Sequence, residues 1–286
     1  MKASFELEVP RAQRASGTAR VRFVSTPDGR TRLSDLFQRA PCRALFPCPE
    51  LGDLTQVVLL TTTGGLTGGD RLRVDVELGD GAQACTTTQA AEKIYRALPT
   101  DEPVSIQTGF RLGAGAWGEW LAQETILFAN ARLRRRFEAE LAPSARLLAV
   151  ESFVLGRIAR DERFDRGLLQ DSWRIRRDGR LIWADGIHLD GDVAAVRAAP
   201  FGFGTGVAYA TVVYVAPDAN HYINEVRRVL KCHGDIGTAT TFDGLLVVRL
   251  IADDVISLRS AVVAVAGGIR HWAAGLPPRM PQVWSC

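Results

Sequence analysis

Three carboxylates stand in or beside apolar stretches of the sequence, where a charged side chain is unusual. Glu151 lies inside the apolar run 147–155, Asp185 follows Leu181-Ile-Trp-Ala, and Glu124 follows Trp120-Leu-Ala-Gln. Burial of an unpartnered carboxylate costs several kcal/mol. Each is therefore expected to pair with an arginine, to be protonated, or to face a wet channel. The sequence leaves two readings open, arginine ion pairs and an oxygen-lined path that holds a metal cation loosely.

The glycine-rich segment 61–70 is a second candidate for chemistry, because four of the six residues from Gly64 to Gly69 are glycine. Glycine lets backbone amides approach a ligand closely, so a phosphate loop is one interpretation. Two details argue against it. No Gly-Lys-Ser/Thr follows, and the next segment has the pattern of a strand instead of a helix whose N-terminus could hold an anion. We therefore expect a tight turn that positions Asp70.

No complete catalytic set follows from the spacing of the remaining residues. The four histidines show no HxH or HExxH spacing, and no serine lies in a nucleophile-elbow context. From the residues alone, two function classes remain. One is a protein without catalytic activity that binds partners, and the other is a β-rich hydrolase with Asp70, Glu124 or Glu151 as acid and base. The hydrolase requires two of these carboxylates to converge in an open pocket.

The composition excludes other classes. The chain has 286 residues, of which 47% are hydrophobic and 23% charged, as in globular proteins. Its net charge of +3 is too small to favour nucleic acid binding, and the basic run Arg134-Arg-Arg136 is short and followed by acidic residues. The five cysteines form no CxxC, and the charged N-terminus does not resemble a signal peptide. We expect a cytoplasmic protein that binds neither nucleic acid nor membrane.

Alternation with a period of two dominates the first two thirds of the chain and predicts a mainly β fold. Apolar and polar residues alternate in segments 71–78, 104–112 and 136–141, as in strands with one buried face. Glycine-rich turns follow the first two of these segments, and Asp178-Gly179 forms a third turn signal. Each turn predicts a strand–turn–strand unit, so we expect stacked hairpins and sheets.

The last third of the chain has a helical pattern. Pro217-Asp218 opens a predicted helix that continues through Leu230, and a second helix is predicted after Asp254. We expect a single domain, 1–286, that is β-rich over 1–216 and contains about two helices over 217–286. The second helix carries an apolar stripe that either completes the core or binds a partner; its residues are Val255, Leu258, Val262, Val265, Ile269 and Trp272.

Three blocks of sequence resemble a known family in their order and spacing. They are Gly64-Gly-Leu-Thr-Gly-Gly-Asp70, the block Thr87-Thr-Gln-Ala-Ala-Glu-Lys93-Ile-Tyr95-Arg96, and Glu119-Trp-Leu-Ala-Gln-Glu124-Thr-Ile-Leu-Phe. A Leu-Pro-Pro-Arg segment ahead of a tryptophan near the C-terminus fits as well. Together these blocks are similar to the signature of the urease accessory protein D family (UreD, also called UreH). The family motif corresponds here to Gly68, Gly69, Asp70, Lys93 and Tyr95.

The resemblance implies a role in urease maturation and no catalytic activity. Proteins of this kind are expected to bind apo-urease subunits and the accessory F protein, which recruits the GTPase accessory G protein. No resident cofactor is expected, although nickel passes through in transit. The resemblance also implies an internal polar passage for nickel. We assign to this passage the carboxylates Glu151, Asp185 and Glu124, together with the hydroxyls of Thr86 and Thr88.

Overall fold

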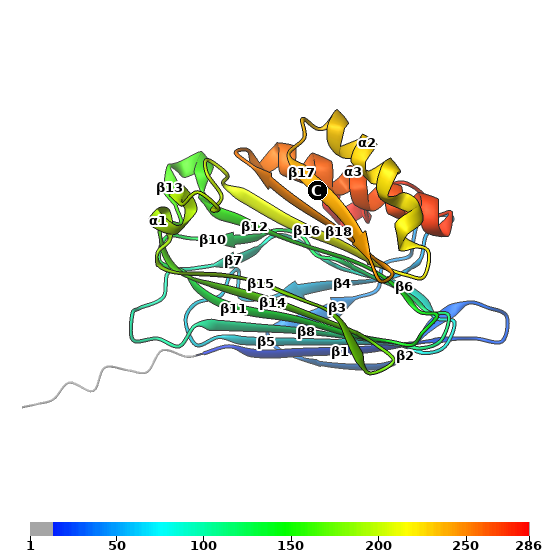
Figure 1. The fold of residues 1–286 in the computed structure, drawn as a ribbon. Coiled ribbons are helices and arrows are strands. Elements are labelled where there is room, and N and C mark those ends of the chain that lie inside the picture. Colours follow the sequence, from blue (N-terminus) through cyan, green and yellow to red (C-terminus); the bar gives the residue numbers. More distant parts are fainter. Residues whose placement is uncertain (1–13, 286) are drawn as a thin grey trace, which may run out of the picture.

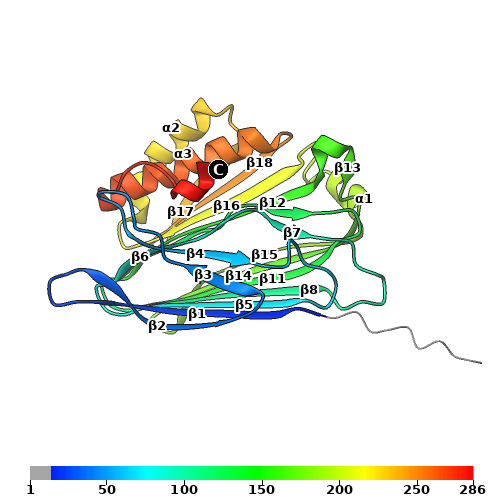
Figure 2. The same ribbon diagram turned by 180° about the vertical axis from the view of Figure 1, so that it is seen from behind.

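Two β-sheets face each other in the computed structural model, which describes residues 14–285. Figures 1 and 2 show the two layers from opposite sides, with helices α2 and α3 lying on the outer face of one sheet. In spatial order the seven-stranded sheet contains β15 (Arg180–Asp192), β14 (Arg166–Arg177), β11 (Arg132–Leu141), β8 (Val104–Leu112), β5 (Arg71–Leu78), β1 (Ser16–Ser25) and β2 (Thr31–Arg39).

The second sheet has eleven strands and is the one that the helices cover. Its main path contains β17 (Gly237–Phe242), β18 (Leu245–Ala252), β16 (Ala208–Val215), β12 (Arg146–Arg157), β9 (Trp117–Leu121), β6 (Gln83–Thr88), β4 (Thr55–Thr61) and β3 (Cys42–Leu45). Beside this path lie β7 (Glu92–Ile94), β10 (Thr125–Leu127) and β13 (Glu162–Arg163). The mainly β prediction is therefore confirmed.

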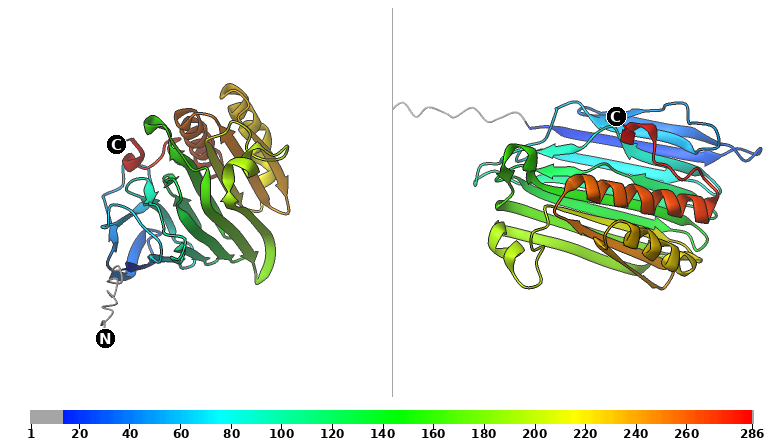
Figure 3. Two further views of the ribbon diagram at one scale, coloured as in Figure 1. Left: turned by 90° about the vertical axis from the view of Figure 1, so that its left-hand side faces the viewer. Right: turned by 90° about the horizontal axis from the view of Figure 1, so that it is seen from above.

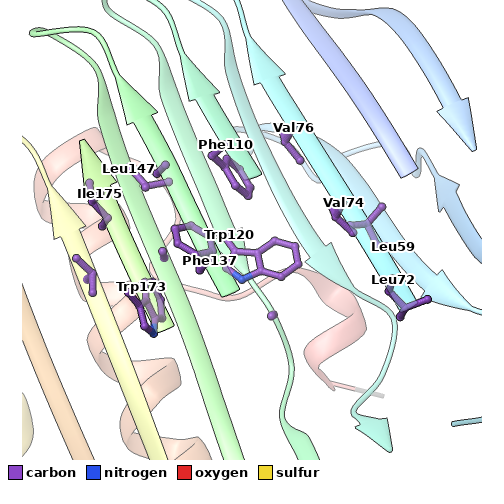
Figure 4. Packing of buried hydrophobic residues seen from close by; sticks show 14 of the residues in the cluster. Leu59, Leu72, Val74, Val76, Phe110, Trp120, Phe137, Leu147, Trp173 and Ile175 are labelled. Atoms are coloured by element: carbon purple, nitrogen blue, oxygen red, sulfur yellow. The ribbon is translucent and has the colours of Figure 1, made fainter. Parts of the chain in front are cut away.

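The principal core lies between the two sheets, because each strand turns one row of apolar side chains toward the opposite sheet. Figure 4 shows Phe110 and Phe137 of the seven-stranded sheet packed near Trp120 of the other. The ring centroids of Phe110 and Trp120 are 5.9 Å apart, an edge-to-face contact. The apolar residues of the alternating segments in the sequence are the ones that face the opposite sheet.

The two glycine-rich turns connect the sheets instead of forming the hairpins that the sequence pattern predicts. The first leads from β5 to β6 and the second from β8 to β9, and in both cases the chain leaves one sheet and enters the other. Successive strands within a sheet are then parallel, as β5 and β8 are. An arch between sheets and a hairpin within one sheet both give alternating strands around a turn. Periodicity alone therefore could not separate them.

The two arches stack on each other through Asp80. The amide of Ala114 donates to Asp80 Oδ1 at 2.7 Å, and the amide of Gly81 donates to the Ala114 carbonyl at 2.8 Å. A Cβ on Gly113 would lie 2.3 Å from Asp80 Oδ1, so this close approach requires glycine. The two turns, 34 residues apart in the sequence, are thus similar because they form two arches stacked on each other.

The third turn signal is a hairpin as predicted. β14 and β15 pair antiparallel around Asp178 and Gly179, whose φ angles are 51° and 72°. Positive φ at both central residues is the geometry of a type I′ turn, which suits the twist of the two strands.

Both predicted helices are present. After the short 3-10 turn Ala219–Tyr222, α2 spans Ile223–Cys232, and α3 spans Val255–Ala274. Asp254 caps α3, because its side chain accepts from the amides of Ile256 and Ser257 at 3.1 and 2.7 Å. Seen from above, α3 and α2 lie side by side on the eleven-stranded sheet (Figure 3). A further short helix, α1 (Val193–Ala198), packs on β14 and β15.

Candidate functional site between the two sheets

A buried polar cluster between the sheets is centred on Arg135 of β11. Its Nε donates to Oδ1 of Asp171 at 2.9 Å, and its Nη1 donates to Oγ1 of Thr125 at 3.2 Å. Its Nη2 lies 2.8 Å from Oε2 of Glu151, an ion pair whose geometry gives neither atom a well-directed hydrogen bond. Arg135 is 5% exposed and Glu151 2%. One guanidinium therefore faces two buried carboxylates.

Two indole N–H groups complete the surroundings of these carboxylates. Trp120 Nε1 donates to Glu151 Oε1 at 3.1 Å, and Trp173 Nε1 donates to Asp171 Oδ2 at 3.1 Å. Burial raises the pKa of Glu151 to about 7, while the Arg135 guanidinium works in the opposite direction. Burial therefore disfavours the charged form of Glu151, and the ion pair with Arg135 favours it.

A cavity of about 210 Å³ adjoins this cluster and reaches the surface beside the exposed residues Gly64, Gln89 and Lys93. It is large enough for more than one water molecule and offers the polar partners that water needs. Figure 4 shows part of its apolar wall, with Trp120 beside Leu59, Leu72 and Val74. The polar groups of the wall are Arg43, Thr61, Thr88, Gln89, Glu92, Lys93, Thr108, Gln123, Thr125, Arg135 and Glu151.

Glu92 of β7 supplies a second carboxyl group to the cavity. Thr61 Oγ1 donates to Glu92 Oε2 at 3.2 Å. Burial raises the pKa of Glu92 to about 7, and the hydrogen bond from Thr61 opposes that shift. The cavity thus has two carboxyl groups whose charged forms are disfavoured by burial.

The two predicted passage threonines occupy different positions. Thr88 lines the cavity, and its Oγ1 accepts from the amide of Gln123 at 2.9 Å. Thr86 is fully buried, and its Oγ1 has no hydrogen-bond partner within residues 14–285. It pairs in register with Trp120, whose side chain lies in the core between the sheets. Thr86 therefore adds an unsatisfied hydroxyl to this core without lining the cavity.

Asp185 lies away from the cavity and is half-buried. It forms an ion pair with Arg249 Nη2, and Arg249 Nη1 donates to the Tyr209 hydroxyl at 2.7 Å. Asp185 belongs to the seven-stranded sheet and Arg249 to the other, so this pair bridges the two layers. Across the eleven-stranded sheet, Glu151, Thr211 and Arg249 are neighbours in register. A row of polar residues thus links the Arg135 cluster to Asp185.

Glu124 is not part of this arrangement. Its two oxygens accept from Arg259 Nη1 of α3 at 2.6 and 2.7 Å, and Arg259 also donates to the Trp284 carbonyl. Glu124 therefore ties helix α3 and the C-terminal segment to the strand region before β10. The structure does not bring it together with Glu151 or Asp185.

The Asp70 carboxylate is occupied by backbone amides. Ala15 N donates to Oδ1 at 2.7 Å and Thr67 N donates to Oδ2 at 2.8 Å. Gly69 has a φ of 84°, and a Cβ on Gly68 would lie 2.7 Å from Asp101 Cβ. This is the tight turn that the sequence predicts. Asp70, Glu124 and Glu151 lie in separate interactions, so the structure gives no support to a hydrolase that uses them as acid and base.

Lys93 and Tyr95 connect the same turn to β7. The amide of Leu66 donates to the Lys93 carbonyl at 2.8 Å, and the Tyr95 hydroxyl donates to the Gly64 carbonyl at 2.8 Å. A Cβ on Gly65 would lie 2.5 Å from the Tyr95 ring, so the ring can pack there only against glycine. The family motif therefore builds one wall of the cavity, where Gly64 and Lys93 are lining residues.

The apolar stripe of α3 completes the core and forms little free surface. Leu258, Val262, Val265 and Ile269 are at most 1% exposed, and they pack against the outer face of the eleven-stranded sheet. Val255 and Trp272 are half-buried against the same cluster. The interpretation of this stripe as a partner-binding surface is corrected accordingly, because the sheet already occupies its apolar face.

Sequence reasoning missed Arg135, Asp171 and Glu92. A signal for Arg135 exists, because period two places it on the same strand face as Leu133 and Phe137, both fully buried. The run Arg134-Arg-Arg136 therefore has one inward arginine between two outward ones. Asp171 has the same signal beside Trp173, whereas nothing in the sequence around Glu92 shows that Thr61 lies beside it.

Two searches of the part of the chain that the structure describes gave no positive result. Within residues 14–285, no three His, Cys, Asp or Glu side chains are grouped so that they could hold a metal ion. Over the same residues, no helix has the length and apolar character needed to cross a membrane.

Comparison with known proteins gives a consistent result. The sequence model of the UreD urease accessory protein family matches residues 15–285. A urease accessory protein UreD from Rhizobium rhizogenes is 42% identical over 275 residues, which cover 96% of this chain and 97% of that protein. One from Methylobacterium sp. (strain 4-46) is 43% identical over 281 residues, or 96% of both chains. The chain therefore belongs to the UreD urease accessory protein family, as a non-catalytic protein of urease maturation.

Proposed function

We propose that this chain holds apo-urease together with the accessory F protein and, through it, the GTPase G protein, in the cytoplasm. We further propose that the cavity between its sheets is part of a polar route along which nickel reaches the urease active site. The family membership and the names of the relatives support the first part. The second part rests on Glu151, a buried carboxyl group in the wall of the cavity between the sheets.

The chemistry of the cavity suits a cation in transit. Carboxyl, hydroxyl and water oxygens hold nickel more weakly than imidazole or thiolate sets do. The wall offers such oxygens from Glu151, Glu92 and Thr88. A route needs several weak sites in series, because one tight site would trap the ion. Thr211 and Asp185 extend the row of oxygens beyond the cavity.

Arg135 explains how the carboxylates stay in place when no metal ion is present. Its guanidinium lies between Glu151 and Asp171 and offsets their charge. A divalent cation that approaches Glu151 competes with this guanidinium, so binding stays weak. The carboxylates are thereby held in position while their affinity for the cation stays low, as transit requires.

The test is a neutral, equally sized substitution at Glu151 together with a matched control. Glu151→Gln removes the charge and keeps an oxygen for the Trp120 N–H. Glu119→Gln removes another buried carboxylate, one that pairs with Arg270 and does not line the cavity. Each variant is co-expressed with the urease subunits and the accessory proteins, and nickel is measured per assembled complex at limiting nickel.

The expected result is a Glu151→Gln chain that assembles normally and delivers less nickel per complex. The Glu119→Gln chain is expected to lose stability and yield, with normal nickel content in each complex that forms. Normal nickel delivery by a well-folded Glu151→Gln chain would remove the route from this account. Failure of the unmodified chain to co-purify with urease would contradict the scaffold role itself.

A further inference from the structure

The outer face of the seven-stranded sheet is a broad charged surface. Helices α2 and α3 lie on the other sheet, and α1 reaches only β14 and β15 (Figures 1 and 2). Alternate residues of β5, β8 and β11 therefore point outward from this face. The register of the parallel strands aligns these side chains into rows that cross the sheet.

Two neighbouring rows contain arginine and no acidic residue. One row runs from Ser16 through Arg71 and Ser105 to Arg134 and Gln170, and the next contains Arg39, Thr18, Arg73, Gln107, Arg136 and Ser172. We call the five arginines of these rows the basic band. All five are exposed; they are Arg39, Arg71, Arg73, Arg134 and Arg136.

The other half of the same face is balanced in charge. The next two rows hold five arginines, Arg20, Arg22, Arg111, Arg174 and Arg176, and five acidic residues, Asp35, Asp75, Glu77, Glu138 and Glu140. Within these two rows Arg22 pairs with Glu77 at 3.2 Å, while Asp75 and Glu138 pair with arginines of the band. Among these four rows, the excess positive charge therefore lies in the basic band.

Most of the band's charge is left without compensation. Arg73 donates to Asp75 at 2.7 Å, and Arg136 lies 3.8 Å from Glu138. Arg39, Arg71 and Arg134 have no acidic partner among residues 14–285. Like charges on neighbouring strands of one face repel each other. An acidic ligand laid across the band would relieve that repulsion.

We propose that the basic band binds an acidic surface region of a folded partner protein, which under the proposed function is apo-urease. A second copy of this chain would bring like charges together. A nucleic acid laid across the face would meet the acidic residues of the balanced half with its uniformly negative backbone. A protein surface can be acidic opposite the band and mixed opposite the balanced half, so it complements both.

The test compares two pairs of substitutions that change the same charge on the same face. Arg71→Gln/Arg134→Gln neutralises two of the three band arginines that have no acidic partner among residues 14–285. Arg111→Gln/Arg174→Gln is the matched control in the balanced half, and Arg71→Lys/Arg134→Lys retains the charge of the band. The dissociation constant of each chain for purified apo-urease is measured from about 50 to 300 mM NaCl, a range over which screening becomes strong.

The band variant is expected to bind about tenfold more weakly than the unmodified chain and with a smaller dependence on salt, as for charges that steer association. The control pair and the lysine pair should stay within about twofold of the unmodified chain. Equal affinity of the band variant and the unmodified chain would overturn the inference while leaving the scaffold role intact.

Two further outcomes would also overturn it. One is tight binding to a DNA duplex of about 20 base pairs that the band substitutions abolish, which would assign the band to nucleic acid. The other is apo-urease binding by the unmodified chain that does not change with salt. If the unmodified chain does not bind apo-urease at all, the proposed function is wrong, and this inference falls with it.

Discussion

At the scale of single residues, the interior between the sheets combines strong pairing with incomplete pairing. Arg135 contacts Asp171, Thr125 and Glu151, yet its Nη2 and Glu151 Oε2 lack a well-directed hydrogen bond. Buried polar atoms in native proteins are usually satisfied, so exceptions beside a cavity call for an explanation. Water in the cavity would satisfy both atoms, whereas a cation would satisfy the Glu151 oxygen alone.

Glu92 gives a residue-level prediction about pH. Its folded-state pKa is about 7 against an ordinary value of 4.5, so between these values the folded chain keeps a proton that the unfolded chain has released. The stability that Glu92 contributes is full below about 4.5 and is lost as pH rises through about 7. Glu92→Gln stays neutral at every pH, so this variant should be more stable than the unmodified chain at pH 8. The expected gain in the free energy of unfolding is about 1–2 kcal/mol, because the partial exposure of Glu92 reduces the effect.

Denaturant unfolding at pH 5 and at pH 8 checks this prediction. Near pH 5 the folded unmodified chain already holds the proton, so the two chains should differ little there. The difference in their free energies of unfolding should therefore grow between the two pH values. A difference that stays constant would mean that Glu92 does not titrate in this range in the folded chain.

At the scale of elements, prediction from the sequence succeeded where one local signal determines the outcome. The heptad-like spacing of Leu258, Val262 and Val265, with Asp254 ahead and Gly275 behind, was sufficient to place α3. The same signals could not say that the stripe faces the chain's own sheet, because an apolar helix face fits a sheet or a partner equally well.

The candidate site was only partly predictable for a similar reason. Glu151 could be found, because a carboxylate in an apolar run is visible in the sequence. Its partner Arg135 comes from the opposite sheet, and pairing between sheets depends on the arches, which alternation does not distinguish from hairpins. Glu124 and Asp185 also pair with arginines from distant segments of the chain, Arg259 and Arg249. The sequence around each carboxylate does not indicate these partners.

Arg270 gives an element-level prediction about how α3 is attached. This arginine is fully buried, and its Nε lies 3.0 and 3.1 Å from the two oxygens of Glu119 on β9. It also pairs with Asp53 and donates to the carbonyls of Pro277 and Arg279. Arg270→Met leaves two buried carboxylates without their cation, so it should cost about 3–5 kcal/mol.

A double substitution separates this charge effect from packing. In Arg270→Met/Glu119→Gln the main unpaired charge is gone, so part of the lost stability should return, and the two effects should not add. Denaturant unfolding of the two single variants and the double variant provides the cycle. Strict additivity would show that Arg270 acts through packing alone and that the ion pair does not attach α3.

At the scale of the whole molecule, the eleven-stranded sheet is shared by two cores. Alternate residues of β12 face opposite sides, with Leu147 and Phe153 in the core between the sheets and Leu148 and Val150 in the core beneath the helices. Neither core can lose its packing without exposing one face of the same strands. The helices therefore support the sheet that lines the cavity. The cavity and the basic band depend on the same packed core between the two sheets.

This sharing predicts that the chain unfolds as a single domain over its whole length, without a boundary near residue 216. Trp173 reports on the core between the sheets and Trp284 on the core beneath the helices, where its Nε1 donates to Thr87 Oγ1 at 3.1 Å. Trp173→Phe and Trp284→Phe each remove one of the six tryptophans, so each lowers the share of one core in the fluorescence signal. Within each variant, the denaturant midpoints from fluorescence and from far-ultraviolet circular dichroism should coincide, because one cooperative transition moves all probes together. If the helical region instead unfolds first, the fluorescence midpoint will lie below that of circular dichroism, and further below it in the Trp173→Phe chain, where fewer tryptophans report on the core between the sheets, than in the Trp284→Phe chain. The residues after 216 would then form a separate unit, and the support that the helices give to the cavity would be lost from this account.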